Sequence, residues 1–138
     1  MDSARPGPGL LVEPGACRAG PAPGHWLASW RIENPNPEPV ELLATWLPHG
    51  RFRGEQQVLS RPIGLGPGES ATLELPVACG EPPGTVVENA FLILRLRWQS
   101  RPWRIFARHR IEFGGEQPPR PRPVCEVITA QPIGFSAG

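Results

Sequence analysis

The chain contains no lysine, only one aspartate and only three cysteines among its 138 residues. All fourteen basic residues are therefore arginines, and the formal net charge is only +1. Because alanine, glycine and proline are also abundant, we attribute the exclusive use of arginine to a GC-rich genome. Neither arginine content nor net charge by itself indicates a nucleic-acid or membrane partner.

Long apolar segments are also missing, since the longest run of apolar residues is only Ala90 to Leu94. No stretch approaches the length of a membrane span, and the N-terminus lacks the basic start and apolar stretch of a signal peptide. Cys17, Cys79 and Cys125 form no closely spaced pair. An odd number of cysteines without a secretion signal predicts reduced thiols and a cytoplasmic protein.

The residues that usually carry catalysis or bind metal are sparse. Asp2 is the only aspartate, so none follows a strand to orient a histidine, and no serine lies in a nucleophile elbow. His25, His49 and His109 do not share a metal-binding spacing with one another or with the cysteines. We therefore predict no enzyme, no metal site and no cofactor.

What the sequence does contain is a repeated alternation of apolar and polar residues between proline and glycine clusters. The segment Leu65 to Val77 has a Gly66-Pro67-Gly68 turn followed by apolar residues at every second position. This period of two is typical of antiparallel strands with one buried face. Similar runs occupy residues 25–33, 40–47, 57–65, 85–98, 103–113 and 124–129.

These runs predict an all-β fold, an antiparallel β-sandwich of seven to eight strands. We expect a Pro/Gly-rich N-terminal segment at residues 1–24, with one short strand at 10–13, and a sandwich domain at 25–138. The runs 57–65 and 71–79 are expected to pair through the intervening turn. Residues 85–98 also fit a helical stripe, but a strand is preferred because a hairpin loop follows. The expected core includes Trp26, Trp30, Trp46, Leu73, Leu75, Leu94, Leu96 and Ile105.

Two turn motifs carry a family resemblance, N-P-N-P-E-P-V-E-L at 34–42 and L-G-P-G-E-S-A-T-L-E-L at 65–75. With these motifs the chain resembles the bacterial immunoglobulin-like accessory domains, including cell-adhesion-related and fibronectin-III-like modules. The resemblance covers roughly residues 25–113. It implies an immunoglobulin-like sandwich that acts as an interaction or structural module.

The hairpin 91–110 concentrates six of the fourteen arginines. If Trp98 pairs with Trp103, then Arg97 lies opposite Arg104, and Arg95 lies opposite Phe106. The outward face of the hairpin is then basic, with interleaved apolar side chains. Like charges directly opposed across two strands are unfavourable unless an anionic group lies between them, so this face favours an anionic partner. This candidate interaction surface comprises Phe91, Ile93, Arg95, Arg97, Arg104, Phe106, Arg108 and Arg110.

Three interpretations of this hairpin remain open at the level of sequence. The first is an ordinary solvated face whose arginines pair with glutamates such as Glu33, Glu41, Glu88 or Glu112. The second is a protein-binding surface, and the third is an anion- or nucleic-acid-binding surface. We predict a non-enzymatic protein-interaction or structural module, with nucleic-acid binding as the alternative. We expect a protein partner rather than nucleic acid, because the chain is nearly neutral. The tract Pro118–Pro123 is expected to be a stiff crossover before the last strand.

Overall fold

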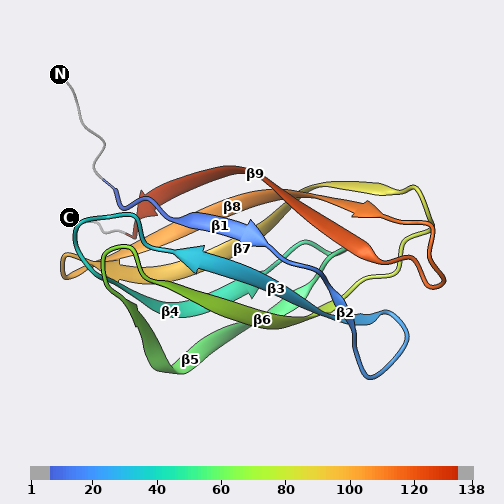
Figure 1. Cartoon of the computed structure of the whole chain (residues 1–138), viewed down its shortest axis with the longest axis horizontal. Helices are drawn as coiled ribbons and strands as arrows, with labels where there is room; N and C mark the ends of the chain where they lie inside the picture. Colours follow the sequence, from blue (N-terminus) through green and yellow to red (C-terminus); the bar gives the residue numbers. More distant parts are fainter. Residues whose placement is uncertain (1–6, 134–138) are drawn as a thin grey trace.

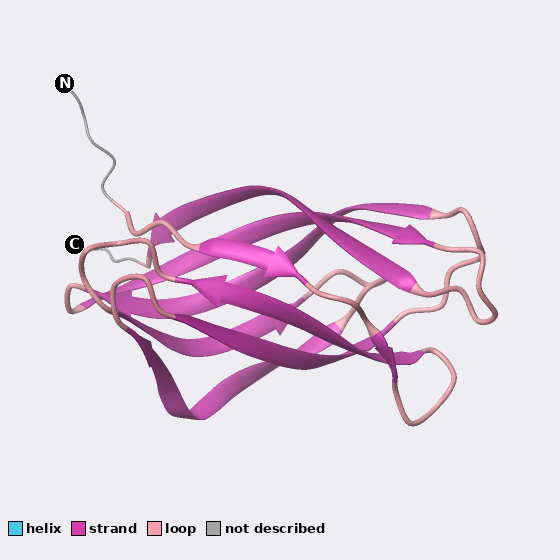
Figure 2. Ribbon diagram, viewed as in Figure 1, coloured by secondary structure: helices cyan, strands magenta, loops and turns pink. Residues whose placement is uncertain are grey.

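A computed structural model describes residues 7–133, and this part of the chain contains nine strands and no helix (Figure 1, Figure 2). The predicted all-β class is therefore confirmed, and residues 85–98 form a strand. The ninth strand, beyond the eight that alternation predicts, is a two-residue segment. The strands are β1 Leu11–Pro14, β2 Arg18–Ala19, β3 His25–Glu33, β4 Val40–Leu47, β5 Gly54–Leu65, β6 Ser70–Ala78, β7 Val86–Trp98, β8 Arg101–Phe113 and β9 Pro121–Pro132.

The strands form two antiparallel sheets that share one hydrophobic core. In the four-stranded sheet, β3 is flanked by β6 on one side and by β1 and β2 on the other. The five-stranded sheet has the order β5-β4-β7-β8-β9. The N-terminal segment 1–24 thus supplies two strands that pair with β3. No helix in residues 7–133 has the length and apolarity needed to cross a membrane.

The expected hairpin between 57–65 and 71–79 is wrong. β5 pairs with β4, whereas β6 pairs with β3 in the other sheet. The Gly66-Pro67-Gly68 turn therefore carries the chain from one sheet to the other, with Gly68 at a φ of 76°. A turn sequence specifies that the chain reverses, but the strand partner depends on which neighbours bury the apolar face.

A single asparagine joins this crossover to the one between β3 and β4. The fully buried Asn34 side chain donates hydrogen bonds from Nδ2 to the carbonyl oxygens of Glu38, Leu65 and Gly66 at 2.9, 3.0 and 3.2 Å. Its Oδ1 accepts a bond of 2.9 Å from the backbone N–H of Asn36. The two turn motifs of the sequence are thus parts of one corner, and they fix the β3 and β6 ends against β4 and β5.

The core lies between the two sheets, and seven of the eight predicted core residues are buried in it: Trp26, Trp30, Leu73, Leu75, Leu94, Leu96 and Ile105. The exception is Trp46, which is 41% exposed. The alternation in β4 changes phase at Leu43, where a β-bulge interrupts the pairing with β7. Beyond the bulge, Thr45 faces the core opposite Leu94, and Trp46 faces outward opposite Ile93. One extra residue in a strand moves every following side chain to the other face.

A buried hydrogen bond connects the two sheets through the core. Trp30 Nε1 on β3 donates to His109 Nε2 on β8 at 3.1 Å, and the two rings meet edge to face. Since Nε2 accepts, the ring proton lies on Nδ1, which is 2.9 Å from the carbonyl oxygen of Ala107 and donates to it. Burial lowers the pKa of His109, and this effect exceeds the opposing effect of the carbonyl hydrogen bond. The imidazole of His109 is therefore neutral at pH 7.

Replacing Trp30, which is buried in the core, should lower the free energy of unfolding much more than replacing Trp46, which lies on the surface. Trp30→Ala should lower the free energy of unfolding by about 3–5 kcal/mol, because it leaves a cavity and an unpaired His109. Trp46→Ala should lower it by only about 1 kcal/mol or less, because the ring lies on an open sheet face. Denaturant titration of both variants measures the difference, and equal losses would contradict the assigned faces.

Acidification should weaken the sheet-to-sheet contact. The folded pKa of His109 lies below its unfolded value of about 6.5, so the unfolded state binds the proton more readily. Stability from this group is complete above pH 6.5 and should fall as the pH drops through that value toward the folded pKa. Urea midpoints measured across this range test the effect. His109→Gln should flatten the dependence, and an unchanged slope in this variant would contradict the assignment to His109.

Candidate functional site

The hairpin that carries the predicted interaction surface is confirmed as a pair of adjacent strands, but its register differs from the prediction. β7 and β8 are joined by a two-residue turn at Gln99 and Ser100, with φ values of 51° and 63°. Trp98 therefore pairs with Arg101 and not with Trp103. Positive φ at both turn positions matches the tight hairpin turns whose twist suits the flanking strands. The predicted pairing of Trp98 with Trp103 places Arg101 and Pro102 in the loop, whereas both belong to β8.

This correction moves each cross-strand pair by two residues. The observed pairs are Arg95 with Arg104, Ile93 with Phe106, Phe91 with Arg108, and Arg97 with Pro102. A shift of two residues changes the neighbours without changing the face. The eight predicted surface residues consequently all lie on one side of the five-stranded sheet, the side away from the core, which we call the outer face.

Four of these eight residues line a shallow depression on the outer face, with a volume of about 240 Å³. We call it the Trp46 hollow, and its lining side chains come from β4, β5, β7 and β8: Trp46, Gln56, Ile93, Arg95, Arg104 and Phe106. Trp46 and Gln56 were missed by the sequence analysis. The one available signal was the pair Leu42-Leu43, two adjacent apolar residues that break the alternation at the bulge.

Two further arginines of the candidate surface, Arg97 and Arg110, donate hydrogen bonds to glutamates. Arg97 donates to Glu41 at 2.8 Å on the neighbouring strand. Arg110 donates to both Glu112 and Glu126, at 2.8 and 2.7 Å. These contacts match the interpretation of a solvated face for this part of the hairpin.

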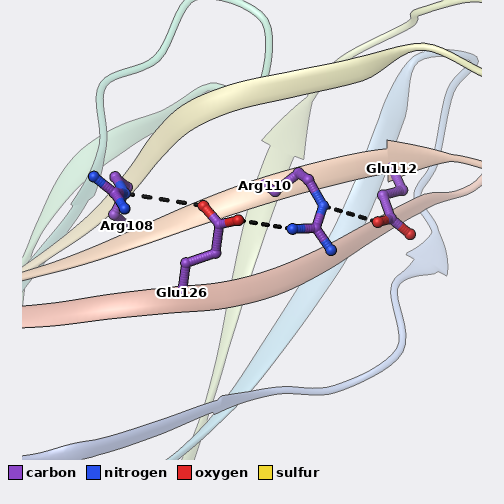
Figure 3. Close-up of polar contacts among 4 residues, drawn as sticks. All are labelled: Arg108, Arg110, Glu112 and Glu126. Atoms are coloured by element: carbon purple, nitrogen blue, oxygen red, sulfur yellow. Dashed lines mark hydrogen bonds and ion pairs between the residues drawn. The ribbon is translucent and has the colours of Figure 1, made fainter.

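Glu126 was not anticipated as a partner, although it lies between two of the predicted arginines (Figure 3). Its carboxylate binds Arg110 and is 3.9 Å from Nε of Arg108. The pairing of β8 with β9 shifts between Arg108 and His109, and Glu126 is the extra residue at this irregularity. A run of alternating residues does not reveal such a bulge, so the sequence placed no glutamate here.

Arg95 and Arg104 differ from these neighbours. They are directly opposite each other in the hairpin, both are exposed, and neither has an ion-pair partner among residues 7–133. Like charges directly opposed across two strands destabilise the sheet. The two guanidinium groups therefore form a local positive charge that the described part of the chain leaves unneutralised.

Apolar side chains surround this charge. Phe91 and Phe106 meet edge to face at a centroid distance of 6.2 Å. Val58 on β5 and Val127 on β9 are 67% and 41% exposed. Aromatic side chains and arginine are enriched at the centres of protein interfaces.

The thiols and imidazoles of the described residues lie apart from the Trp46 hollow. Burial raises the pKa of Cys17 to about 11 and that of Cys79 to about 12, so both thiols are protonated at neutral pH. His109 has both ring nitrogens engaged in the core. Within residues 7–133, no three histidine, cysteine or acidic side chains cluster as they would around a metal ion.

A second hollow lies between residues 19–26, which connect β2 to β3, and the loop 116–120, with a volume of about 700 Å³. Arg120 is the arginine that lines this hollow, and its guanidinium group already contacts other parts of the chain. Arg120 donates to the carbonyl oxygen of Cys17 at 2.6 Å and stands over the Trp26 ring at 5.8 Å. These contacts hold the loop before β9 against the N-terminal strands, so we assign this hollow a structural role.

No protein-family model, curated protein or solved structure matches this chain. The assignment of a site therefore depends on the geometry of the outer face.

Because Arg95 and Arg104 repel each other across the strands, reversing the charge of one of them should increase the free energy of unfolding. Arg104→Glu replaces a repulsive cross-strand pair by an attractive one, and we expect a gain on the order of 0.5 kcal/mol at low salt. The gain should shrink as salt screens the exposed charges. Urea midpoints at two salt concentrations measure it. A loss above about 1 kcal/mol would instead make Arg104 a structural residue.

Proposed function

We propose that this chain is a non-enzymatic protein-interaction module that binds a polypeptide partner through its outer face. The observation that carries the proposal is the Trp46 hollow, where an exposed tryptophan and two arginines without an ion-pair partner among residues 7–133 lie among apolar side chains on one sheet face. Tryptophan and arginine are the residues most enriched among those that dominate binding energy at interfaces.

The fold supports an interaction role by resemblance. We infer an immunoglobulin-like sandwich, because β5-β4-β7-β8 follow the order C′-C-F-G and β3 pairs with β6 as strand B pairs with strand E in such domains. In this comparison the outer face belongs to the C′-C-F-G sheet, and β9 is an additional strand beyond G. Such sandwiches serve many functions, so the function is argued from the outer face alone.

If a partner binds to the outer face, substitutions on that face should reduce the amount of partner that the protein retains. Purified protein, used to capture proteins from its native host, should retain a partner that Phe106→Ala and Arg104→Glu each reduce by about tenfold or more. Quantitative mass spectrometry of the captured proteins provides the measurement.

The matched controls lie on the exposed side of the four-stranded sheet. Leu11→Ala and Arg31→Glu remove an exposed apolar and an exposed basic side chain there, and both should retain the partner at the wild-type level. Urea midpoints verify that all four variants are folded. Equal retention by all four variants, or no specific retention by the wild type, would contradict the proposal.

A further inference from the structure

We propose that Arg95 and Arg104 together bind the carboxylate of an aspartate or glutamate side chain from the partner polypeptide, and that an apolar residue next to it packs against Trp46 and Phe106. This inference rests on the proposed function and names the chemistry of its partner.

Cross-strand geometry places the two guanidinium groups at one site. Residues directly opposite each other in antiparallel strands have Cβ atoms about 4.5–5.5 Å apart, and Arg95 and Arg104 are such a pair. Two long side chains starting this close can converge on one anion. A carboxylate accepts several hydrogen bonds at once and is well matched to the planar guanidinium group.

The immediate surroundings suit a side chain better than a free metabolite. The volume of about 240 Å³ is below the roughly 300–1,000 Å³ that is typical of small-molecule sites. Trp46 stands on β4 opposite Ile93 on β7, and Ile93 in turn lies opposite Phe106 on β8. An apolar neighbour of the bound carboxylate would cover these side chains and exclude water, which strengthens the charged hydrogen bonds.

The pattern of charge on the outer face favours a polypeptide over a nucleic acid. A phosphate backbone repeats its charge along its length and needs a continuous basic track. Here Arg97 is already bound by Glu41, and Arg110 by Glu112 and Glu126, and these carboxylates would repel phosphates on either side. A single cationic spot flanked by neutralised pairs matches one carboxylate.

The test uses the full chain and a displayed library of random peptides, fused at their C-termini so that no terminal carboxylate is free. Selection should enrich peptides in which aspartate or glutamate adjoins an aromatic or branched apolar residue. For a selected peptide, changing the acid to its amide should weaken binding by about tenfold or more, since hydrogen bonds to ionised groups are the stronger ones. Fluorescence anisotropy of the labelled peptide measures this change.

A charge swap tests whether the two arginines are the groups that bind the acid. Arg104→Glu should abolish binding of the acidic peptide, because the introduced carboxylate pairs with Arg95 across the strands. Reversing both charges, with Arg95→Glu and Arg104→Glu together, should permit binding of the same peptide with arginine in place of the acid. Arg31→Glu on the other sheet should change neither affinity. Trp46→Ala should weaken the binding of the acidic peptide by about tenfold, as expected when an aromatic anchor is lost from an interface.

Several outcomes would overturn the inference. These are a library that yields no saturable binder, binders whose affinity survives the acid-to-amide change, or a salt-sensitive gel shift with a mixed-sequence duplex that depends on Arg104. If host proteins are still retained through the outer face in any of these cases, the interaction module stands and only the acidic ligand is wrong. If the variants of the outer face retain all host proteins equally, the proposed function itself fails.

Discussion

The hydrogen bond between Trp30 and His109 is the contact on which the relation of the two sheets depends. It joins β3 to β8 through a core that is otherwise almost entirely apolar, and both partners are about 1% exposed. Apolar packing is non-directional, whereas a buried donor and acceptor that meet only each other permit one alignment. The ring of Phe52, which meets Trp30 edge to face, completes this centre.

This alignment also determines what the opposite side of β8 displays. Side chains alternate along a strand, so fixing His109 and Ile105 toward the core directs Arg104, Phe106 and Arg108 to the outer face. The core therefore positions the Trp46 hollow rigidly, although no residue of the hollow belongs to the core cluster. A site on the central strands of a sheet is held more firmly than one on a loop.

Irregular pairing, more than the regular strands, gives the outer face its character. The bulge in β4 exposes Trp46, and the bulge in β9 brings Glu126 between Arg108 and Arg110. The first places an apolar anchor beside Arg95 and Arg104, which have no ion-pair partner in the described part of the chain, and the second neutralises charge in the adjacent part of the hairpin. Together they convert a uniformly basic stripe into one cationic spot with an apolar border. Bulges commonly redirect side chains in this way.

The fold class, nearly every strand and most of the core could be predicted from the order of residues along the chain. Alternation over residues such as those of β3 and β8 is a local property, because the side-chain period of a strand is two whatever the strand pairs with. The same property assigned all eight hairpin residues to one face. The partner of each strand, the register of the hairpin and the side on which Trp46 lies became clear from the folded chain. These depend on turn dihedrals at Gln99 and Ser100, on bulges, and on the Asn34 corner, which joins residues about thirty positions apart. Such choices depend on the burial and hydrogen bonding of the whole core. Apart from the adjacent Leu42 and Leu43 at the bulge in β4, no local pattern of residues indicates them.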